Sequence, residues 1–469
     1  MVSAEVALGL TAVTLVVLTA SGLWYSRSRV GSVEDFISAR DSAGPGATTA
    51  TLVASVMGVW ILLTPAEAGA AFGGVAAVAG YAVGEALPML AFVKLGPRIR
   101  ELVPEGHSLT EYALVRYGPA MYAFVLLVSL FYMFVFLAAE LTGITSALQL
   151  IAGVPRWQTA SLVGGAVLVY TAYGGLRASI FTDTVQVLFV LPLLALSAVG
   201  AVLALGGPGT VHAQVTAADP SLLDPTFVTG LRFGFWVAIA ILGAELINQT
   251  WWQRAYAARD AETLAQGFRT AAVVNPLVVL VAGLFGVVAR GYVDIVTDPA
   301  SDAYNASIAF FVLLDAAFPE PLVLAVVLLA LLLVASTADT LFNAMASLVT
   351  ADLPRLLDDP GDRTLTWGAR ALTVVAALAA IYVSLRARSV LRLFLLADLL
   401  GVALMVPLLY GLYSERASGR DRASDPRGTH LREVGPEVPL DHRPHVVASG
   451  VRAHPGPATD RRSKRLATR

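Results

Sequence analysis

The chain has 469 residues, of which 57% are hydrophobic and 14% are charged, whereas an ordinary soluble domain has about 25% charged residues. This composition excludes a soluble globular protein, and a formal net charge of -2 gives no basic surface for a nucleic-acid partner. The absence of cysteine excludes disulfides, thiolate metal sites and cysteine nucleophiles. Apolar residues lie in blocks of about 20, which is the length that crosses a bilayer, so we expect an all-α polytopic membrane protein.

About eleven apolar runs separated by polar gaps are expected to form transmembrane helices. The first run is expected to be a retained anchor helix and not a cleaved signal peptide, because no Lys or Arg precedes it. In chain order the runs cover residues 4–24, 46–68, 69–95, 118–150, 157–175, 183–206, 228–250, 268–292, 320–349, 368–385 and 391–413.

The distribution of Lys and Arg predicts the orientation of these helices. If the N-terminus lies outside, most of the basic residues in the connections face the cytoplasm, as the positive-inside rule requires. An odd number of spans then places the C-terminus inside. Residues 414–469 are rich in charged residues, Pro and Gly, so they cannot bury an apolar core and are expected to form a disordered cytoplasmic tail.

Two of the runs are interrupted by glycine and polar residues near mid-depth. Gly69 follows the polar stretch Thr64–Glu67 in the first, and Gly243 precedes Glu245 and Asn248 in the second. Paired interrupted helices in corresponding positions indicate a transporter binding site, because unwound backbone exposes carbonyls for ions and helix ends for substrate. Ordinary kinks or small-residue packing faces are the alternative interpretation.

Ionisable residues are rare within the runs, and each is a functional candidate because a charge at membrane depth costs about 2.5–3.5 kcal/mol. None of them is expected to have a buried Lys or Arg as a partner. A path lined by carboxylates, hydroxyls and carbonyls suits a cation better than an anion. Glu67 and Asp183 also fit simple helix ends. The acids are Glu67, Glu85, Glu140, Asp183, Glu245, Asp339 and Asp398.

A polar stripe runs down the otherwise apolar span at 320–349. Ser336, Thr340, Asn343 and Ser347 recur at helical spacing and therefore share one face. Hard oxygen ligands stacked on one face are what a dehydrated small cation requires. Hydrogen bonding between helices would also explain the stripe, and both interpretations remain open.

Three stretches resemble motifs of the sodium:solute symporter family, in the expected order, and the similarity covers residues 30–413. The stretches are Tyr170–Gln186, Trp252–Asp260 and Ser336–Thr340. The resemblance implies a five-plus-five inverted-repeat, LeuT-like transporter core with one extra N-terminal helix. The implied organisation is an extra helix at 1–30, a first repeat at 31–227, a second repeat at 228–413 and the tail at 414–469.

The resemblance also implies a sodium site between two helices. Its ligands would be three backbone carbonyls and two hydroxyls, with a carboxylate nearby as a further charge, and Na+ would be the coupling ion with no other cofactor. The proline-transporting branch has an acid where this chain has Val56, which argues against proline. Matched by motif, the carbonyls belong to Ala54, Met57 and Leu333, the hydroxyls to Ser336 and Thr337, and the carboxylate to Asp183.

Within the family, the stretches Lys94–Glu111 and Gly175–Asp183 look most like the urea-type branch. Aromatic walls with hydrogen-bond acceptors suit a neutral donor such as urea, and equally a cationic amine. We therefore expect a sodium-coupled symporter that imports a small polar organic solute, with urea as one candidate. The residues expected to line the substrate cavity are Trp60, Glu85, Tyr132, Phe136, Glu140 and Glu245.

Other functions were weighed against this expectation. An enzyme is not expected, because no histidine lies in a span and a metal hydrolase would need clustered ligands. Sodium- or proton-coupled uptake of a different solute, such as an amino acid, amine, carboxylate or sugar, remains open. A channel-like or sensing relative is the other alternative. The expected partners are therefore a small-molecule substrate, Na+ and the lipid bilayer of the cell membrane.

Overall fold

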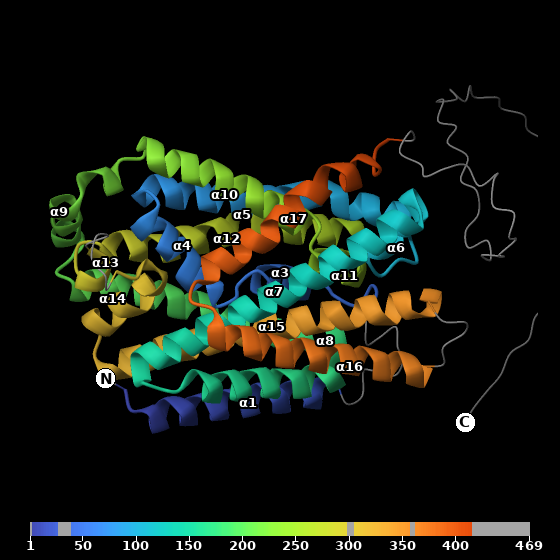
Figure 1. The fold of residues 1–469 in the computed structure, drawn as a ribbon, viewed down its shortest axis with the longest axis horizontal. Coiled ribbons are helices and arrows are strands. Elements are labelled where there is room, and N and C mark those ends of the chain that lie inside the picture. The colour runs from blue at the N-terminus through green and yellow to red at the C-terminus, as the bar shows by residue number, and fades with distance from the viewer. Residues whose placement is uncertain (1, 27–38, 298–303, 357–361, 415–469) are drawn as a thin grey trace, which may run out of the picture. The chain divides into compact units, whose positions relative to one another are not determined.

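The helices of the protein lie side by side in one bundle, and most of them run along the horizontal direction of Figure 1. The computed structural model describes residues 2–26, 39–297, 304–356 and 362–414. Within those ranges every regular element is helical, and an isolated bridge joins Ala43 to Ala258. The elements are α1 (Ala4–Ser26), α3 (Pro45–Ala54), α4 (Trp60–Ala71), α5 (Gly74–Leu102), α6 (Leu109–Tyr117), α7 (Pro119–Ala152), α8 (Arg156–Ala204), α9 (Pro208–Ala218), η1 (Pro220–Leu223), α10 (Val228–Leu246), α11 (Gln249–Ala257), α12 (Ala261–Ala289), α13 (Asp294–Thr297), η2 (Ala306–Ile308), α14 (Ala309–Ala317), α15 (Glu320–Leu356), α16 (Asp362–Arg386) and α17 (Val390–Tyr410).

The outer surface of the bundle is apolar. In the described part of the chain, nine helices are long and apolar enough to cross a membrane. Large side chains such as Val16, Leu188, Leu196 and Trp236 are more than half exposed on this surface. Exposed apolar surface of this extent is unfavourable in water but matches hydrocarbon, and helices satisfy their backbone groups internally as lipid requires. The prediction of an all-α polytopic membrane protein is confirmed.

Helix α8 doubles back along its length. It contains 49 residues and would be about 74 Å long if it were straight. Both of its ends lie at the same end of the bundle, where Arg156 donates to the carbonyl of Ala387 at 2.9 Å and the carbonyl of Leu205 accepts from Tyr292 at 3.2 Å. Leu176, in contrast, packs against the residues that precede α3. The two arms of α8 therefore correspond to two predicted runs, 157–175 and 183–206.

The other predicted runs also correspond to elements of the structure, although their boundaries differ. The run at 46–68 is divided into α3 and α4, and the run at 228–250 into α10 and the start of α11. Helix α12 begins at Ala261, earlier than the predicted residue 268, because its polar first turn is capped by Asp260. The number of membrane crossings, about eleven, stays a prediction. The expected tail beyond Ser414 and the side chains of residues 170–175 lie outside the described residues.

Close contacts between small residues join α5, α10 and α17. A Cβ atom on Gly80 of α5 would lie 2.2 Å from the Cα of Gly234 in α10, so these two backbones touch. In the same way, a Cβ on Gly401 of α17 would lie 2.6 Å from the Cα of Ala244 in α10. Helices in lipid associate through such small-residue contacts because dispersion forces act best at short range. The contacts bring together the three helices that carry Glu85, Glu245 and Asp398.

Candidate functional site

The first broken helix opens between α3 and α4. After Ala54 the regular helical hydrogen bonds stop, and Met57 donates instead to the carbonyl of Ala54 at 2.9 Å. Gly58 leaves room for the carboxylate of Glu140, because a Cβ there would lie 2.0 Å from Oε1 of Glu140. The first amides of α4 then point at Glu140 of α7, whose Oε2 accepts from Val59 at 2.8 Å. A carboxylate in this position balances the positive end of the α4 dipole.

Asp183 of α8 gathers hydroxyl groups beside this break. Its Oδ1 accepts from Ser336 of α15 at 2.6 Å, and its Oδ2 accepts from Thr51 of α3 at 2.6 Å. The hydroxyl of Ser336 also lies 3.4 Å from the carbonyl of Ala54. The structure therefore brings together three of the six residues expected at the sodium site, namely Ala54, Asp183 and Ser336.

Thr337, the next residue of α15, carries a hydroxyl that has no hydrogen-bond partner among the described residues. The residue is 1% exposed. Buried hydroxyl groups almost always have a partner, so an orphaned one at this point fits a ligand that the protein itself does not supply. Leu333 lies one turn earlier on the same helix, and Met57 lies within the break. Carbonyl and hydroxyl oxygens of this kind are hard ligands that suit Na+.

Arg254 of α11 is buried against Asp183, which corrects the expectation that the acids have no basic partner. The side chain is 1% exposed, and its Nη2 lies 3.5 Å from Oδ2 of Asp183. It also donates to Thr340 at 2.8 Å and to Thr51 at 3.1 Å. Hydropathy places Arg254 in a connection after the span. The sequence analysis did not find this pairing, because it treated the span as ending before Arg254. In the structure, α11 forms the second half of the broken helix and keeps Arg254 inside the protein.

The residues of the polar stripe of α15 make contacts with two different parts of the structure. Ser336 contacts the Asp183 group, whereas Thr340 accepts from Arg254 and Ser347 accepts from Gln249 of α11 at 3.4 Å. The C-terminal part of the stripe, Thr340 and Ser347, therefore attaches α11 to α15 through hydrogen bonds between helices. Hydrogen bonding between helices therefore accounts for Thr340 and Ser347, whereas the interpretation of the stripe as a set of cation ligands stays a prediction.

The second broken helix, between α10 and α11, satisfies its own polar groups. Asn248 caps α11 by accepting from the amide of Thr250 at 3.0 Å. Glu245, at the end of α10, accepts from Tyr132 at 2.9 Å, from Asn248 at 3.2 Å and from the indole of Trp251. Each hydrogen bond fixes one carboxylate lone pair in place. The charge of Glu245 is thus held rigidly at the junction of α7, α10 and α11.

Two further carboxylates lie in the electrostatic neighbourhood of Glu245. The side chain of Glu85 on α5 interacts with Glu245 and with Asp398 of α17, and all three residues are buried. In the described part of the chain, Oε2 of Glu85 has no hydrogen-bond partner. The sequence analysis included Asp398 among the ionisable residues of the runs, but no sequence pattern predicted that it lies near Glu85 and Glu245. The close packing of α5, α10 and α17 accounts for this meeting.

Aromatic side chains complete this region. The ring of Trp60 lies 5.6 Å from that of Phe394, 6.2 Å from that of Tyr81 and 6.3 Å from that of Phe136. The ring of Tyr132 lies 5.8 Å from that of Phe136. We call the whole group the acid–aromatic cluster. Its members are Trp60, Tyr81, Glu85, Tyr132, Phe136, Glu245, Phe394 and Asp398.

Five of the six residues expected to bind substrate belong to the acid–aromatic cluster, namely Trp60, Glu85, Tyr132, Phe136 and Glu245. The sixth, Glu140, is directed at the start of α4 instead. Tyr81, Phe394 and Asp398 are the members that the sequence analysis did not select. Ring stacking and charge proximity across helices carry no local sequence signal. Their binding roles stay predictions.

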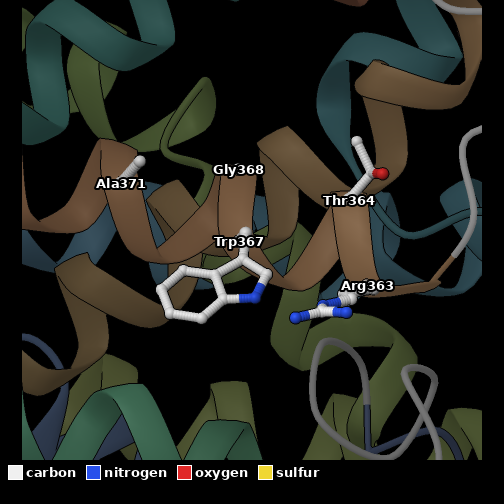
Figure 2. A pocket seen from close by; sticks show the side chains of 5 residues that line it. All are labelled: Arg363, Thr364, Trp367, Gly368 and Ala371. Carbon is white, nitrogen blue, oxygen red and sulfur yellow. The ribbon is translucent and has the colours of Figure 1, made fainter.

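A surface hollow of about 520 Å³ lies along α16, away from the acid–aromatic cluster. Figure 2 shows Arg363 and Trp367 side by side on this helix. Arg370 lies 5.7 Å from the ring of Trp367. Arginine and tryptophan at a helix end are typical of the boundary between lipid and water. All residues that line the hollow, Arg363, Thr364, Trp367, Gly368 and Ala371, belong to α16.

Comparison with known proteins places this geometry in context. The model of the sodium:solute symporter family matches residues 36–420. The chain is 26% identical to the spermidine transporter of Candida albicans over 84% of this chain and 72% of that protein. It is 25% identical to the probable urea active transporter 1 of Schizosaccharomyces pombe, over 55% of this chain and 41% of that protein. The chain therefore spans less than half the length of the urea transporter.

The fold is similar to that of a solved Na+-coupled sialic acid symporter in a substrate-bound, outward-open state. The TM-score is 0.72 at 16% sequence identity, and the alignment covers 87% of each chain. A likeness at this identity concerns the arrangement of helices only. It confirms the expected five-plus-five, LeuT-like fold class, and the family match confirms the expected resemblance.

Proposed function

We propose that this chain, which belongs to the sodium:solute symporter family, imports a small polar organic solute across the cell membrane together with Na+. The observation that carries the proposal is the group of oxygens at the first helix break. There the carbonyl of Ala54, the hydroxyl of Ser336 and the carboxylate of Asp183 meet, and the next residue, Thr337, has a buried hydroxyl without a hydrogen-bond partner among the described residues. The chain is a transporter and not an enzyme.

The proposed ion site joins two helices that are far apart in the sequence. The carbonyls of Ala54 and Met57 would hold Na+ from the α3 side, and the carbonyl of Leu333 with the hydroxyls of Ser336 and Thr337 would hold it from α15. Asp183 would add negative charge nearby. Ion binding at such a place favours the conformation in which both helices contribute ligands, because a ligand stabilises the state that binds it best.

A single Na+ supplies enough energy for concentrative uptake. Movement of one charge down a potential of about 100 mV releases roughly 2.3 kcal/mol. This energy corresponds to an accumulation of a neutral solute by about fiftyfold. Any concentration gradient of Na+ adds to that value.

We also propose the orientation, with the N-terminus outside and the C-terminus in the cytoplasm. This orientation follows from the distribution of Lys and Arg in the connections. Cysteine residues introduced into a chain that has none provide a direct test. A single cysteine at Ser3 should react with a membrane-impermeant maleimide in intact cells, whereas one at Ser414 should react only after permeabilisation.

The acid–aromatic cluster is the proposed substrate site. Its carboxylates accept hydrogen bonds, so the solute should carry several N–H donors. Urea and amines both meet this requirement, and both classes appear in the names of relatives, one a urea transporter and another a spermidine transporter. The relatives support the donor-rich solute class without choosing between its two members.

The decisive experiment is uptake into proteoliposomes that contain the purified full chain. A panel of radiolabelled solutes, including urea, spermidine, an amino acid, a sugar and a carboxylate, is offered with and without an inward Na+ gradient. We expect the gradient to accelerate the uptake of a donor-rich solute. Replacing Na+ by choline should abolish this acceleration, and adding a proton gradient should not restore it. If Na+ changes the uptake of no solute in the panel, the proposed coupling is wrong.

A further inference from the structure

We propose that the acid–aromatic cluster binds a linear alkyl polyamine, so the transported solute is an organic cation and not neutral urea. This inference rests on the proposed function as a Na+-coupled importer. It depends on the contrast between two groups of buried acids in the same membrane protein. One group is neutralised by the protein itself, and the other is not.

The protein balances the charge of Asp183 with its own cation. Arg254 approaches Asp183 to 3.5 Å, and both residues are fully buried. The acid–aromatic cluster has no such partner among the described residues. Among the described residues, no Lys or Arg forms an ion pair with Glu85, Glu245 or Asp398, and the charged neighbours of Glu85 are the carboxylates of Glu245 and Asp398. Because each buried charge is costly, three acids without a cation indicate that the solute brings the positive charge.

The hydrogen bonding of the three acids indicates which of them contacts the solute. Glu245 is occupied by Tyr132, Asn248 and Trp251, so it serves as a fixed negative charge. Glu85 has a free Oε2, although the residue is 2% exposed. A buried carboxylate oxygen without a hydrogen-bond donor has a high free-energy cost, so we expect the solute to supply a donor to it. An ammonium group supplies both the N–H donor and the opposite charge.

The spacing of the acids argues against a bare metal ion as the missing cation. In the described part of the chain, no group of three or more His, Asp or Glu side chains is close enough to hold one metal ion. The three carboxylates act on one another electrostatically but do not form a single coordination shell. A flexible chain with separated ammonium groups can place a positive charge near more than one of them.

The aromatic members of the cluster suit the remainder of a polyamine. The rings of Trp60, Tyr81, Phe136 and Phe394 lie within 4.5–6.3 Å of one another in a connected series. Aromatic faces attract cations and also cover methylene groups. A polyamine offers both ammonium groups and methylene groups. Urea offers neither, so a site with three acids and five aromatic side chains is poorly matched to it.

The test compares spermidine with urea in proteoliposomes that contain the full chain. The variants are Glu85→Gln and Asp398→Asn, each of which removes one charge while keeping shape and polarity. The control is Glu262→Gln, a carboxylate on the exposed first turn of α12. We expect Na+-driven spermidine uptake in the wild type and the control. Each cluster variant should weaken the apparent affinity for spermidine about tenfold or more.

A binding measurement keeps the test independent of transport. Spermidine should raise the thermal unfolding temperature of the detergent-solubilised wild type, whereas diacetylated spermidine, which lacks two charges, should do so about tenfold less potently. Equal potency of the two compounds would overturn the inference. It also fails if Na+ drives urea uptake while spermidine neither enters nor competes, although the proposed function would then stand. If Na+ drives the uptake of no solute, the proposed function is refuted. The comparison of spermidine with diacetylated spermidine in thermal unfolding would still decide whether the cluster binds a polyamine.

Discussion

The two broken helices solve the same structural problem in different ways. Between α3 and α4 the chain leaves the helix for Ser55–Val59, and the amide of Val59 is satisfied by Glu140 from another helix. Between α10 and α11 only Ile247 and Asn248 intervene, and Asn248 caps the following helix with its own side chain. The first break is therefore open and depends on distant groups, whereas the second is short and satisfied locally.

This difference indicates a division of tasks. The open break leaves the carbonyl of Ala54 3.4 Å from the hydroxyl of Ser336. The next residue, Thr337, has a buried hydroxyl without a hydrogen-bond partner among the described residues, and oxygens of these kinds suit a small cation. The closed break is rigid and holds Glu245 and Arg254 on either side of it. Because Arg254 contacts the Asp183 group and Glu245 belongs to the acid–aromatic cluster, α10 and α11 connect the proposed ion site to the proposed substrate site. A mutation of Glu245 or of Arg254 should therefore change the apparent affinity for both Na+ and the substrate.

The largest effect on stability is expected from Arg254→Met, which removes the guanidinium group that pairs with Asp183. A buried carboxylate without its partner should cost about 3–5 kcal/mol of stability. Thermal unfolding in detergent measures the loss. The double variant Arg254→Met with Asp183→Asn removes both charges and should recover much of it. Equal destabilisation in the single and double variants would mean that the pair is not coupled and that the link between the breaks is only a matter of packing.

Gly58→Ala tests whether the open break needs its exact shape. The new Cβ would overlap the carboxylate of Glu140 and the ring of Trp60, so these buried side chains must shift, at a cost of about 1–3 kcal/mol. Gly165→Ala is the matched control, because a Cβ there meets no atom within 4 Å. We expect Gly58→Ala to lower both thermal stability and Na+-driven uptake. If the two variants behave alike, the open break tolerates rearrangement and the proposed ion geometry loses its main support.

Asn248→Ala tests the self-sufficiency of the closed break. Loss of a helix cap typically costs about 1 kcal/mol, and here the side chain also donates to Glu245 at 3.2 Å. Substrate affinity should therefore fall along with stability, whereas the Na+ concentration for half-maximal uptake at saturating substrate should change little. Asn248→Ser, which keeps a capping oxygen but lacks the amide that donates to Glu245, should restore much of the stability but not the substrate affinity. Restoration of neither by Ser would show that the cap is unimportant to α11.

The smallest effect on stability, and the most specific effect on function, is expected from Thr337→Ala. The hydroxyl has no protein partner, so its removal should leave thermal stability nearly unchanged. Loss of one ion ligand worth about 1 kcal/mol should raise the half-saturating Na+ concentration about fivefold. Ser336→Ala should raise it as well, but with a loss of stability because Asp183 then loses a donor. An unchanged Na+ dependence in Thr337→Ala would remove this residue from the ion site.

Part of the proposed ion site was predictable from the sequence, because the motif Ser336–Thr340 is local and lies on one helix. The interruption of the first run was expected near Gly69, but the structure keeps α4 helical there and breaks the chain at Ser55–Val59 instead. Family resemblance adds Asp183, which the structure places 2.6 Å from Ser336. The membrane-spanning fold was predictable as well, since the length and apolarity of a helix in lipid are properties of the chain itself.

Only the tertiary structure decided which acids have a cation. Arg254 and Asp183 are 71 residues apart in the sequence, and hydropathy assigns the arginine to a connection outside the membrane. Asp398, Phe394 and Tyr81 likewise join the acid–aromatic cluster through the packing of α5, α10 and α17 and not through any spacing along the chain. A sequence determines the cost of a buried charge, but the partner that offsets this cost can come from any helix, so charge balance is a property of the folded protein.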